Sequence, residues 1–210
     1  QLFENAPGSA VTQIIVAALF YALFSASLNN TLLLLWSTTL SLLAISRLIL
    51  VWLYKKKASK NIGSWLNTFT LITFLIGVTW ACFGLFYLTV DDIALKYLFF
   101  VTICGMVAAA VPILAAWTPA YYANTLPQLI SLPAILVYSN SMTNDFLAIA
   151  FIIYCFMLIR LQSNANQNIR IAFQLQHKND ALVEELSDEV QYREQLIKRR
   201  TQELKDSLLE

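Results

Sequence analysis

Apolar residues fall into six long runs, separated by short polar segments, over the first three quarters of the chain. A membrane-spanning helix needs about 20 mostly apolar residues, and each run has about that length or slightly less. The pattern therefore predicts an all-α, six-span transmembrane helical bundle over residues 1–162, with spans at 10–28, 31–54, 64–88, 97–117, 120–140 and 145–162. Because only Asn29 and Asn30 separate the first two spans, these should form a tight antiparallel hairpin.

Beyond the last span the pattern changes to steps of three and four residues, which is typical of a coiled coil. The stepped positions are Asn168, Ala172, Leu175, Asn179, Leu182, Leu186, Val190, Arg193, Ile197, Arg200, Leu204 and Ser207. Two consecutive steps of four meet at Leu186, a stutter that locally unwinds a supercoil. We expect a cytoplasmic coiled-coil signalling helix at 163–210 that forms a parallel homodimer, with its seam at Leu182, Leu186, Ile197 and Leu204. The alternative is a solvated single helix.

The charges follow the same division of the chain. Residues 1–160 carry eleven charged side chains and residues 161–210 carry sixteen. The whole chain is 58% hydrophobic and 13% charged, whereas soluble domains have about 45–50% apolar and about 25% charged residues. The first part is therefore a membrane protein, and a soluble enzyme domain is excluded.

The connection between the second and third spans carries the densest basic cluster of the membrane part, Lys55, Lys56, Lys57 and Lys60. Short loops that are rich in Lys and Arg stay in the cytoplasm. We therefore expect a multi-pass protein of the bacterial inner (cytoplasmic) membrane with both termini in the cytoplasm. Asp91 and Asp92 would then face outward.

Several functional classes lack the residues they require. None of the six spans has an Asp or Glu in its interior, whereas proton- and cation-coupled carriers usually depend on buried carboxylates. The single histidine, His177, lies beyond the last span, and Cys82, Cys104 and Cys155 all fall inside apolar runs. We expect no metal site, no cofactor and no catalytic residue. The net charge of +1, without a basic stripe, gives no reason to expect nucleic-acid binding.

Polar residues at membrane depth either pack between helices or line a cavity. Arg47 is the most informative, since it lies seven residues before the end of its span and has no acidic residue at its level. Four further polar residues lie in the same predicted inner-leaflet layer: Asn67, Thr70, Asn124 and Gln128. Pro127 should also free the carbonyl of Ala123. These groups, with Trp80 nearer the middle of the membrane, are the candidate ligand-binding residues. The alternatives are a snorkelling arginine and a structural polar network.

Small residues recur on one side of the third and fourth predicted spans. They are Gly77, Ala81 and Gly84 in the third span and Gly105 and Ala109 in the fourth. Small side chains let helices approach closely, so we expect these five positions to pack helix against helix.

Together these motifs resemble a known class of signalling protein. The chain combines the basic loop with Gly77-x-x-Trp80, a small-rich fourth span (Gly105-Met106-Val107-Ala108-Ala109-Ala110) and a last span that continues into Leu182-Val183-Glu184-Glu185-Leu186 and Arg199-Arg200-Thr201-Gln202-Glu203-Leu204. It resembles the N-terminal polytopic membrane sensor regions of bacterial hybrid sensor histidine kinases and of GGDEF-type diguanylate cyclases. Some of these relatives are quorum-sensing kinases, so the resemblance implies small amphiphilic signals. No catalytic residue carries over, because His177 in Gln176-His177-Lys178-Asn179 lacks the phosphoacceptor pattern.

The sequence thus predicts a sensor module that detects a hydrophobic or amphiphilic signal in or near the membrane. It would regulate, through a helix dimer, a kinase or cyclase domain that we expect to follow residue 210. Two alternatives remain: a ligand-free membrane anchor that dimerises the output domain and, more remotely, a small transporter.

Overall fold

The computed structural model describes residues 2–57, 62–139 and 141–207. Within these ranges every regular element is a helix, so the prediction of an all-helical chain is confirmed. The helices are α1 (Leu2–Phe24), α2 (Asn30–Lys57), α3 (Ile62–Phe83), the short 3₁₀ helix η1 (Gly84–Leu88), α4 (Ile93–Leu114), α5 (Thr118–Tyr138) and α6 (Met142–Ser207).

Among the described residues, five helices are long and apolar enough to cross a membrane: α1, α2, α3 with η1, α4 and the first part of α6. The exception is α5, which lies where the fifth span was predicted. It contains Pro127 and Pro133, and its polar residues Asn124, Thr125 and Gln128 are buried. The inward-facing polar side chains lower the hydropathy of α5, while its outward face still carries exposed apolar residues such as Leu126 and Ile130.

The chain divides into two compact units, residues 1–166 and 167–210. In the second unit the described residues form the continuation of α6, in which Glu189 and Arg193 make an ion pair at 2.6 Å. The side chains of Leu182, Leu186 and Ile197 are exposed in the single chain. That of Leu204 lies outside the described side chains.

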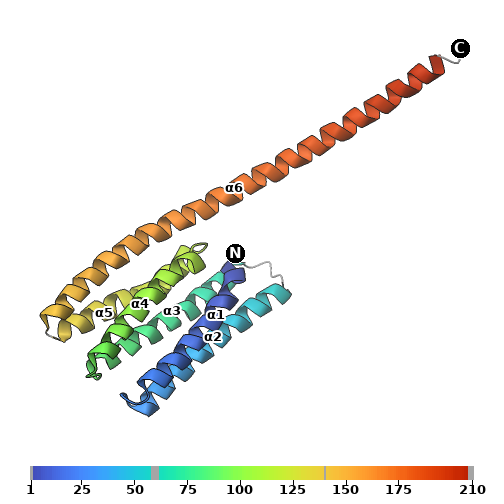
Figure 1. Cartoon of the computed structure of the whole chain (residues 1–210). Coiled ribbons are helices and arrows are strands. Elements are labelled where there is room, and N and C mark those ends of the chain that lie inside the picture. Colours follow the sequence, from blue (N-terminus) through green and yellow to red (C-terminus); the bar gives the residue numbers. More distant parts are fainter. Residues whose placement is uncertain (1, 58–61, 140, 208–210) are drawn as a thin grey trace. The chain divides into compact units, whose positions relative to one another are not determined.

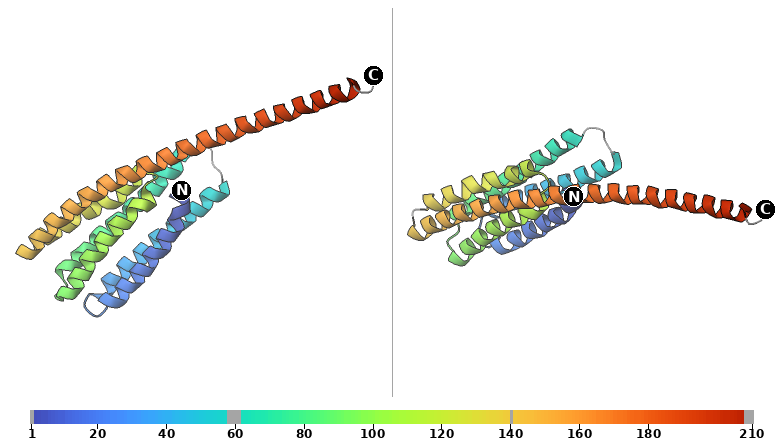
Figure 2. Two further views of the ribbon diagram at one scale, coloured as in Figure 1. Left: turned by 45° about the horizontal axis from the view of Figure 1, so that its top comes forward. Right: turned by 90° about the horizontal axis from the view of Figure 1, so that it is seen from above.

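The first unit is a bundle in which α1 to α5 lie side by side along a common direction (Figures 1 and 2). Helix α3 contacts α2 on one side and α5 on the other, and α1 contacts both α2 and α4. Side-chain caps fix two of the turns between these helices. Asn29 Oδ1 accepts from the backbone N–H of Thr31 at 3.0 Å, where α2 begins. Asp92 accepts from the N–H of Ala94 at 2.8 Å, at the start of α4.

The contact of α3 and η1 with α5 depends on two glycines, Gly77 in α3 and Gly84 at the start of η1. A Cβ atom on Gly77 would clash with the backbone carbonyl oxygen of Asn124 and would lie 3.0 Å from its Cα. A Cβ on Gly84 would lie 2.8 Å from Ile135 Cδ1. The backbones of α3 and α5 therefore come closer than any side chain at position 77 would allow.

Aromatic rings fill the half of the bundle that lies near the α1–α2 turn. Trp36 stacks on Phe83 with ring centroids 4.0 Å apart, and Trp80 meets Trp36 edge to face at 5.3 Å. Phe20 and Phe24 of α1 complete this cluster. Trp36 is buried and donates its indole N–H to the Thr79 carbonyl at 2.9 Å.

Side chains of α6 hold the C-terminal half of α4. Tyr154 donates its hydroxyl to the carbonyl of Cys104 at 2.7 Å. Gln162 donates to the carbonyl of Leu114 at 3.3 Å, and Asn166 to that of Ala115 at 2.6 Å. The carbonyls at a helix C-terminus have no intrahelical partner, so α6 supplies two of the groups that cap α4.

The two glycines at positions 77 and 105 form a matched test of this packing. Gly77→Ala should lower the free energy of unfolding by about 1–3 kcal/mol, because α5 must move away to make room for the methyl group. Gly105→Ala should leave it unchanged or raise it slightly, because no atom lies within 4 Å of the new Cβ. Thermal unfolding in the same detergent measures both. Equal melting temperatures for the two variants would contradict the close α3–α5 contact.

Candidate functional site

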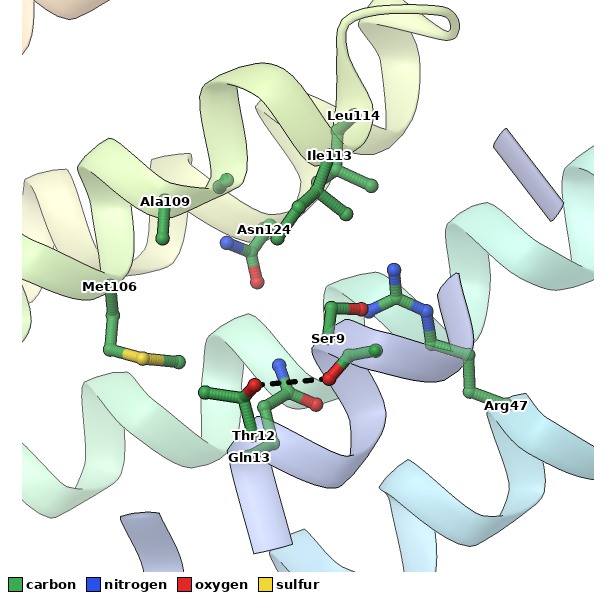
Figure 3. A pocket seen from close by; sticks show the side chains of 11 residues that line it. Ser9, Thr12, Gln13, Arg47, Met106, Ala109, Ile113, Leu114 and Asn124 are labelled. Carbon is green, nitrogen blue, oxygen red and sulfur yellow. Dashed lines mark hydrogen bonds between the residues drawn. The ribbon is translucent and has the colours of Figure 1, made fainter. Parts of the chain in front are cut away.

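A cavity of about 270 Å³ lies in the half of the bundle away from the aromatic cluster. Its walls come from the N-terminal part of α1, from Arg47 of α2, from the C-terminal half of α4 and from Asn124 of α5 (Figure 3). Prediction from the sequence placed the candidate ligand site in this layer, although it did not include α1.

Arg47 is the charged residue of this cavity, and its side chain is only 2% exposed. Its Nε and Nη2 atoms are buried and have no hydrogen-bond partner among the described residues. The guanidinium carbon lies 4.7 Å from the centre of the Phe69 ring, a cation–π contact that offsets part of the desolvation cost. None of the described side chains that line the cavity is acidic. The positive charge therefore lacks a counter-ion among the described residues that line the cavity.

Neutral polar groups surround the rest of the cavity. Gln13 and Asn124 are both buried, and the Oε1 atom of Gln13 has no partner among the described residues. Thr12 already donates its hydroxyl to the carbonyl of Gly8 at 3.0 Å, the bond drawn in Figure 3. The cavity thus offers one cation together with amide and hydroxyl groups, a set that suits a polar head group carrying a negative charge.

The other predicted polar residues are only partly brought together. Gln128 is buried and donates to the Asn124 carbonyl at 3.0 Å, so it supports Asn124 and does not line the cavity. Thr70 accepts from the indole N–H of Trp117 at 3.0 Å. Asn67 is exposed on the surface of α3. Thr70 and Asn67 therefore do not belong to the cavity.

Trp80 lies away from the cavity, within the aromatic cluster. Its indole N–H is buried without a partner among the described residues, as is the Oε1 atom of Gln128. Both residues line a small gap between α3, α4 and α5 that has no room for a water molecule. Trp80 is therefore a packing residue in this state of the protein.

The small residues of α3 and α4 have different surroundings. Gly77 and Gly84 pack tightly against α5, and Ala81 between them is half-buried. Gly105 and Ala109 were also predicted to pack helix against helix, yet Gly105 has no atom within 4 Å of a Cβ position and both residues are exposed. Ala109 lines the Arg47 cavity instead.

Prediction from the sequence missed the contribution of α1. Gln13 is a long polar residue inside an apolar run and about as far from its helix end as Arg47 is from the end of α2. This similar depth was the feature of the sequence that could have assigned Gln13 to the same site as Arg47. The structure brings the two side chains to the same cavity because α1 and α2 are antiparallel (Figure 1).

A second, more polar cavity of about 290 Å³ lies at the opposite ends of the helices. It is lined by Lys96, Tyr87 and Asn144, among others. Tyr87 donates its hydroxyl to Asn144 Oδ1 at 3.0 Å, and the Lys96 ammonium lies 5.4 Å from the Tyr87 ring centre. Tyr87 and Asn144 of this cavity are thus hydrogen-bonded to each other, whereas Arg47 Nε and Nη2 have no hydrogen-bond partner among the described residues.

The comparisons with known proteins give no relative. No family model, no curated protein and no solved structure matches the chain. The function must therefore be argued from the cavity and from the helices that form it.

The absence of a counter-ion among the described residues leads to a prediction about the stability of the protein. Replacing Arg47 with Met should raise the free energy of unfolding of the ligand-free protein by about 1–3 kcal/mol, because an uncompensated buried charge is replaced by a flexible apolar side chain of similar length. The measurement is thermal unfolding in an uncharged detergent without added lipid. Arg160→Met, at an exposed position of α6, is the matched control and should change stability by less than about 0.5 kcal/mol. A lower melting temperature for Arg47→Met would show that Arg47 is compensated.

Proposed function

We propose that this protein is a membrane-embedded input module that binds an anionic amphiphile at Arg47 and transmits binding through α6. The observation that carries the proposal is a buried guanidinium, without a protein counter-ion among the described residues, beside a cavity with room for a ligand. As in the proteins that the sequence resembles, the receiver would be a histidine kinase or diguanylate cyclase domain joined to the C-terminal helix.

The electrostatics favour an anion over a neutral ligand. An arginine at membrane depth costs about 2.5–3.5 kcal/mol on insertion scales. Neutral amides such as those of Gln13 and Asn124 can accept hydrogen bonds, but they leave the charge uncompensated. A carboxylate or phosphate supplies two acceptor oxygens that match the guanidinium fork and neutralises it.

The size of the cavity limits the ligand. Drug-sized ligands occupy pockets of about 300–1,000 Å³, and this cavity is slightly smaller, at about 270 Å³. It has room for a head group and a few methylene groups. A large polar signal, such as a peptide, would not fit.

A continuous set of contacts joins the cavity to α6. Leu114 lines the cavity, and its backbone carbonyl accepts the hydrogen bond from Gln162. Asn166 holds the next carbonyl, that of Ala115. A ligand that displaces the end of α4 therefore acts directly on the segment of α6 that precedes the polar helix at 167–207.

The proposed orientation follows from the basic segment after α2. With Lys55 and Lys56 in the cytoplasm of a bacterium, the Arg47 cavity lies in the inner leaflet, and α6 leaves the membrane on the same side. Two copies would pair in parallel through the seam formed by Leu182, Leu186, Ile197 and Leu204.

The second candidate function is a ligand-free anchor that only locates and dimerises an output domain. The tightly packed aromatic cluster around Trp80 favours it, since that half of the bundle offers no space. The Arg47 cavity favours sensing, because a membrane anchor does not require a buried charge, and such a charge lowers the stability of the fold.

Ligand binding can be tested with dodecanoate as the probe. Dodecanoate should raise the melting temperature of the wild-type protein in a concentration-dependent way, because a ligand that binds only the folded state stabilises it. Arg47→Lys keeps the charge but loses the bidentate geometry, so its affinity should fall about tenfold or more. Arg47→Met should show no stabilisation by dodecanoate.

The control is dodecyl maltoside, which has the same chain and no charge, and it should stabilise all variants equally. Wild-type stabilisation that persists in Arg47→Met would mean that the fatty acid acts as a detergent, and the ligand site would be rejected.

Coupling and dimerisation can be tested together by cysteine crosslinking, after Cys82, Cys104 and Cys155 are replaced by alanine. Cysteine at Leu182 or Leu186 should crosslink two copies more efficiently than cysteine at Glu185, because only the former lie on the seam. Dodecanoate should change this pattern, and Gln162→Leu should abolish the change while leaving dodecanoate binding intact. Equal crosslinking at all three positions would contradict a defined dimer.

A further inference from the structure

We infer that the ligand reaches Arg47 sideways from the lipid, through an opening between α1 and α4, and is therefore a single-chain amphiphile dissolved in the membrane. This inference rests on the proposed anion binding at Arg47. It adds the route of entry and the number of acyl chains, which the charge of the site alone does not define.

The rim of the cavity is made of the smallest side chains on both helices. Ala109 of α4 lines the cavity and is also exposed, and Gly105 lies one helical turn, about 6 Å, further along the same stripe. On α1, Gly8 lines the cavity and is exposed. A Cβ added at Gly8 or at Gly105 would meet no atom within 4 Å. The space beside these residues is therefore open.

The residues next to this rim identify its surroundings as lipid. On α1, Val11 is 50% and Ile15 is 54% exposed; on α4, Val101 is 64% exposed. Apolar side chains this exposed on a membrane helix face acyl chains. An opening between them therefore leads into the hydrocarbon of the bilayer.

The cavity changes in polarity from its inner wall to its rim. Met106 and Ala109 lie across the space from Arg47, with the polar side chains of Gln13 and Asn124 between them (Figure 3). An amphiphile can therefore bind in this cavity in only one orientation. Its anionic head meets Arg47, and its chain leaves past Met106 and Ala109.

The volume favours one chain. The cavity holds about 270 Å³, which is small even for a drug-sized ligand, so most of the acyl chain must lie outside it in the opening. Beside the glycines at the rim there is open space for one chain, since a Cβ at Gly8 or Gly105 would meet no atom within 4 Å. A diacyl phospholipid would have to fit a glycerol and two chains at the same point.

The same residues allow a competing explanation. Gly105 and Ala109 are spaced four apart on an exposed face, a pattern that pairs membrane helices of two copies. Such a pair would cover the opening with protein. The unpartnered, buried guanidinium in the cavity directly beneath favours a ligand, since a second copy contributes no anion through this stripe.

The experiment fills the opening with a large side chain. Ala109→Trp places an indole at the rim, and Ala134→Trp on α5, also exposed and not among the residues that line this cavity, is the matched control. Gly105→Leu is a second blocking variant. Each is assayed in nanodiscs of zwitterionic lipid by thermal stabilisation with dodecanoate and, at millimolar concentration, with butyrate, which carries the same carboxylate on a chain too short to leave the cavity.

We expect dodecanoate affinity to fall at least tenfold in Ala109→Trp and Gly105→Leu, with butyrate affected less than twofold and Ala134→Trp unchanged. Arg47→Lys should weaken both probes. Wild-type dodecanoate affinity in both blocking variants would overturn lateral entry while leaving the Arg47 site in place. Unchanged affinities in Arg47→Lys would overturn the proposed function itself.

Two further measurements decide between the possible occupants of the opening. Adding phosphatidylglycerol to the nanodiscs should not displace dodecanoate; displacement would assign the site to a diacyl lipid and overturn the single chain. The mass of the wild-type assembly should be the same as that of Ala109→Trp. A smaller assembly in Ala109→Trp would show that the stripe pairs two copies, and the lateral opening would be rejected.

Discussion

The close approach of α3 and α5 at Gly77 fixes the position of the groups that form the site. Because the α3 backbone lies directly against the Asn124 carbonyl, α5 turns its polar side, Asn124, Thr125 and Gln128, into the bundle. The Asn124 carbonyl also accepts the hydrogen bond from Gln128. This carbonyl is therefore in contact with Gly77 of α3 and bonded to a side chain of its own helix. Asn124 reaches the cavity only because this contact leaves no room for α5 to rotate.

In hydrocarbon each polar group needs a partner within the protein. The buried donors of Trp80, Tyr121 and Thr125 lack one among the described residues, whereas several other donors have one. Trp36 donates to Thr79, Trp117 to Thr70 and Tyr154 to Cys104. The bonds of Trp36 and Tyr154 join two helices, and that of Trp117 ties the α4–α5 turn to α3, so all three fix the bundle as well as satisfying the donor. Arg47 differs from these groups because it is charged and therefore has the largest desolvation cost. Its Nε and Nη2 atoms lack a hydrogen bond among the described residues.

The sequence pattern was sufficient to predict the helices but not their rotation. Run length and the break at Asn29–Asn30 predicted six helical segments. Each predicted span overlaps one long described helix, and the third also covers η1. Depth along a helix predicted that Arg47 and Asn124 share a layer. It could not show which face each residue occupies, so Asn67 and Thr70 were grouped with them although α3 turns Asn67 outward and Thr70 towards Trp117. Gly105 and Gly77 look alike in the sequence, and only the neighbouring helices distinguish a packed glycine from an open one.

The two halves of the bundle contribute differently to the proposed mechanism. The half near the α1–α2 turn is filled by interlocking rings around Trp80 and Phe83, and a packed core resists small displacements. The other half contains the cavity, the end of α4 and Arg47, whose charge has no counter-ion among the described residues of the cavity. Displacement is therefore easiest beside Leu114, whose carbonyl is held by Gln162. In the proposed mechanism, neutralising Arg47 would act on this less tightly packed half and, through the hydrogen bonds of Gln162 and Asn166, on α6.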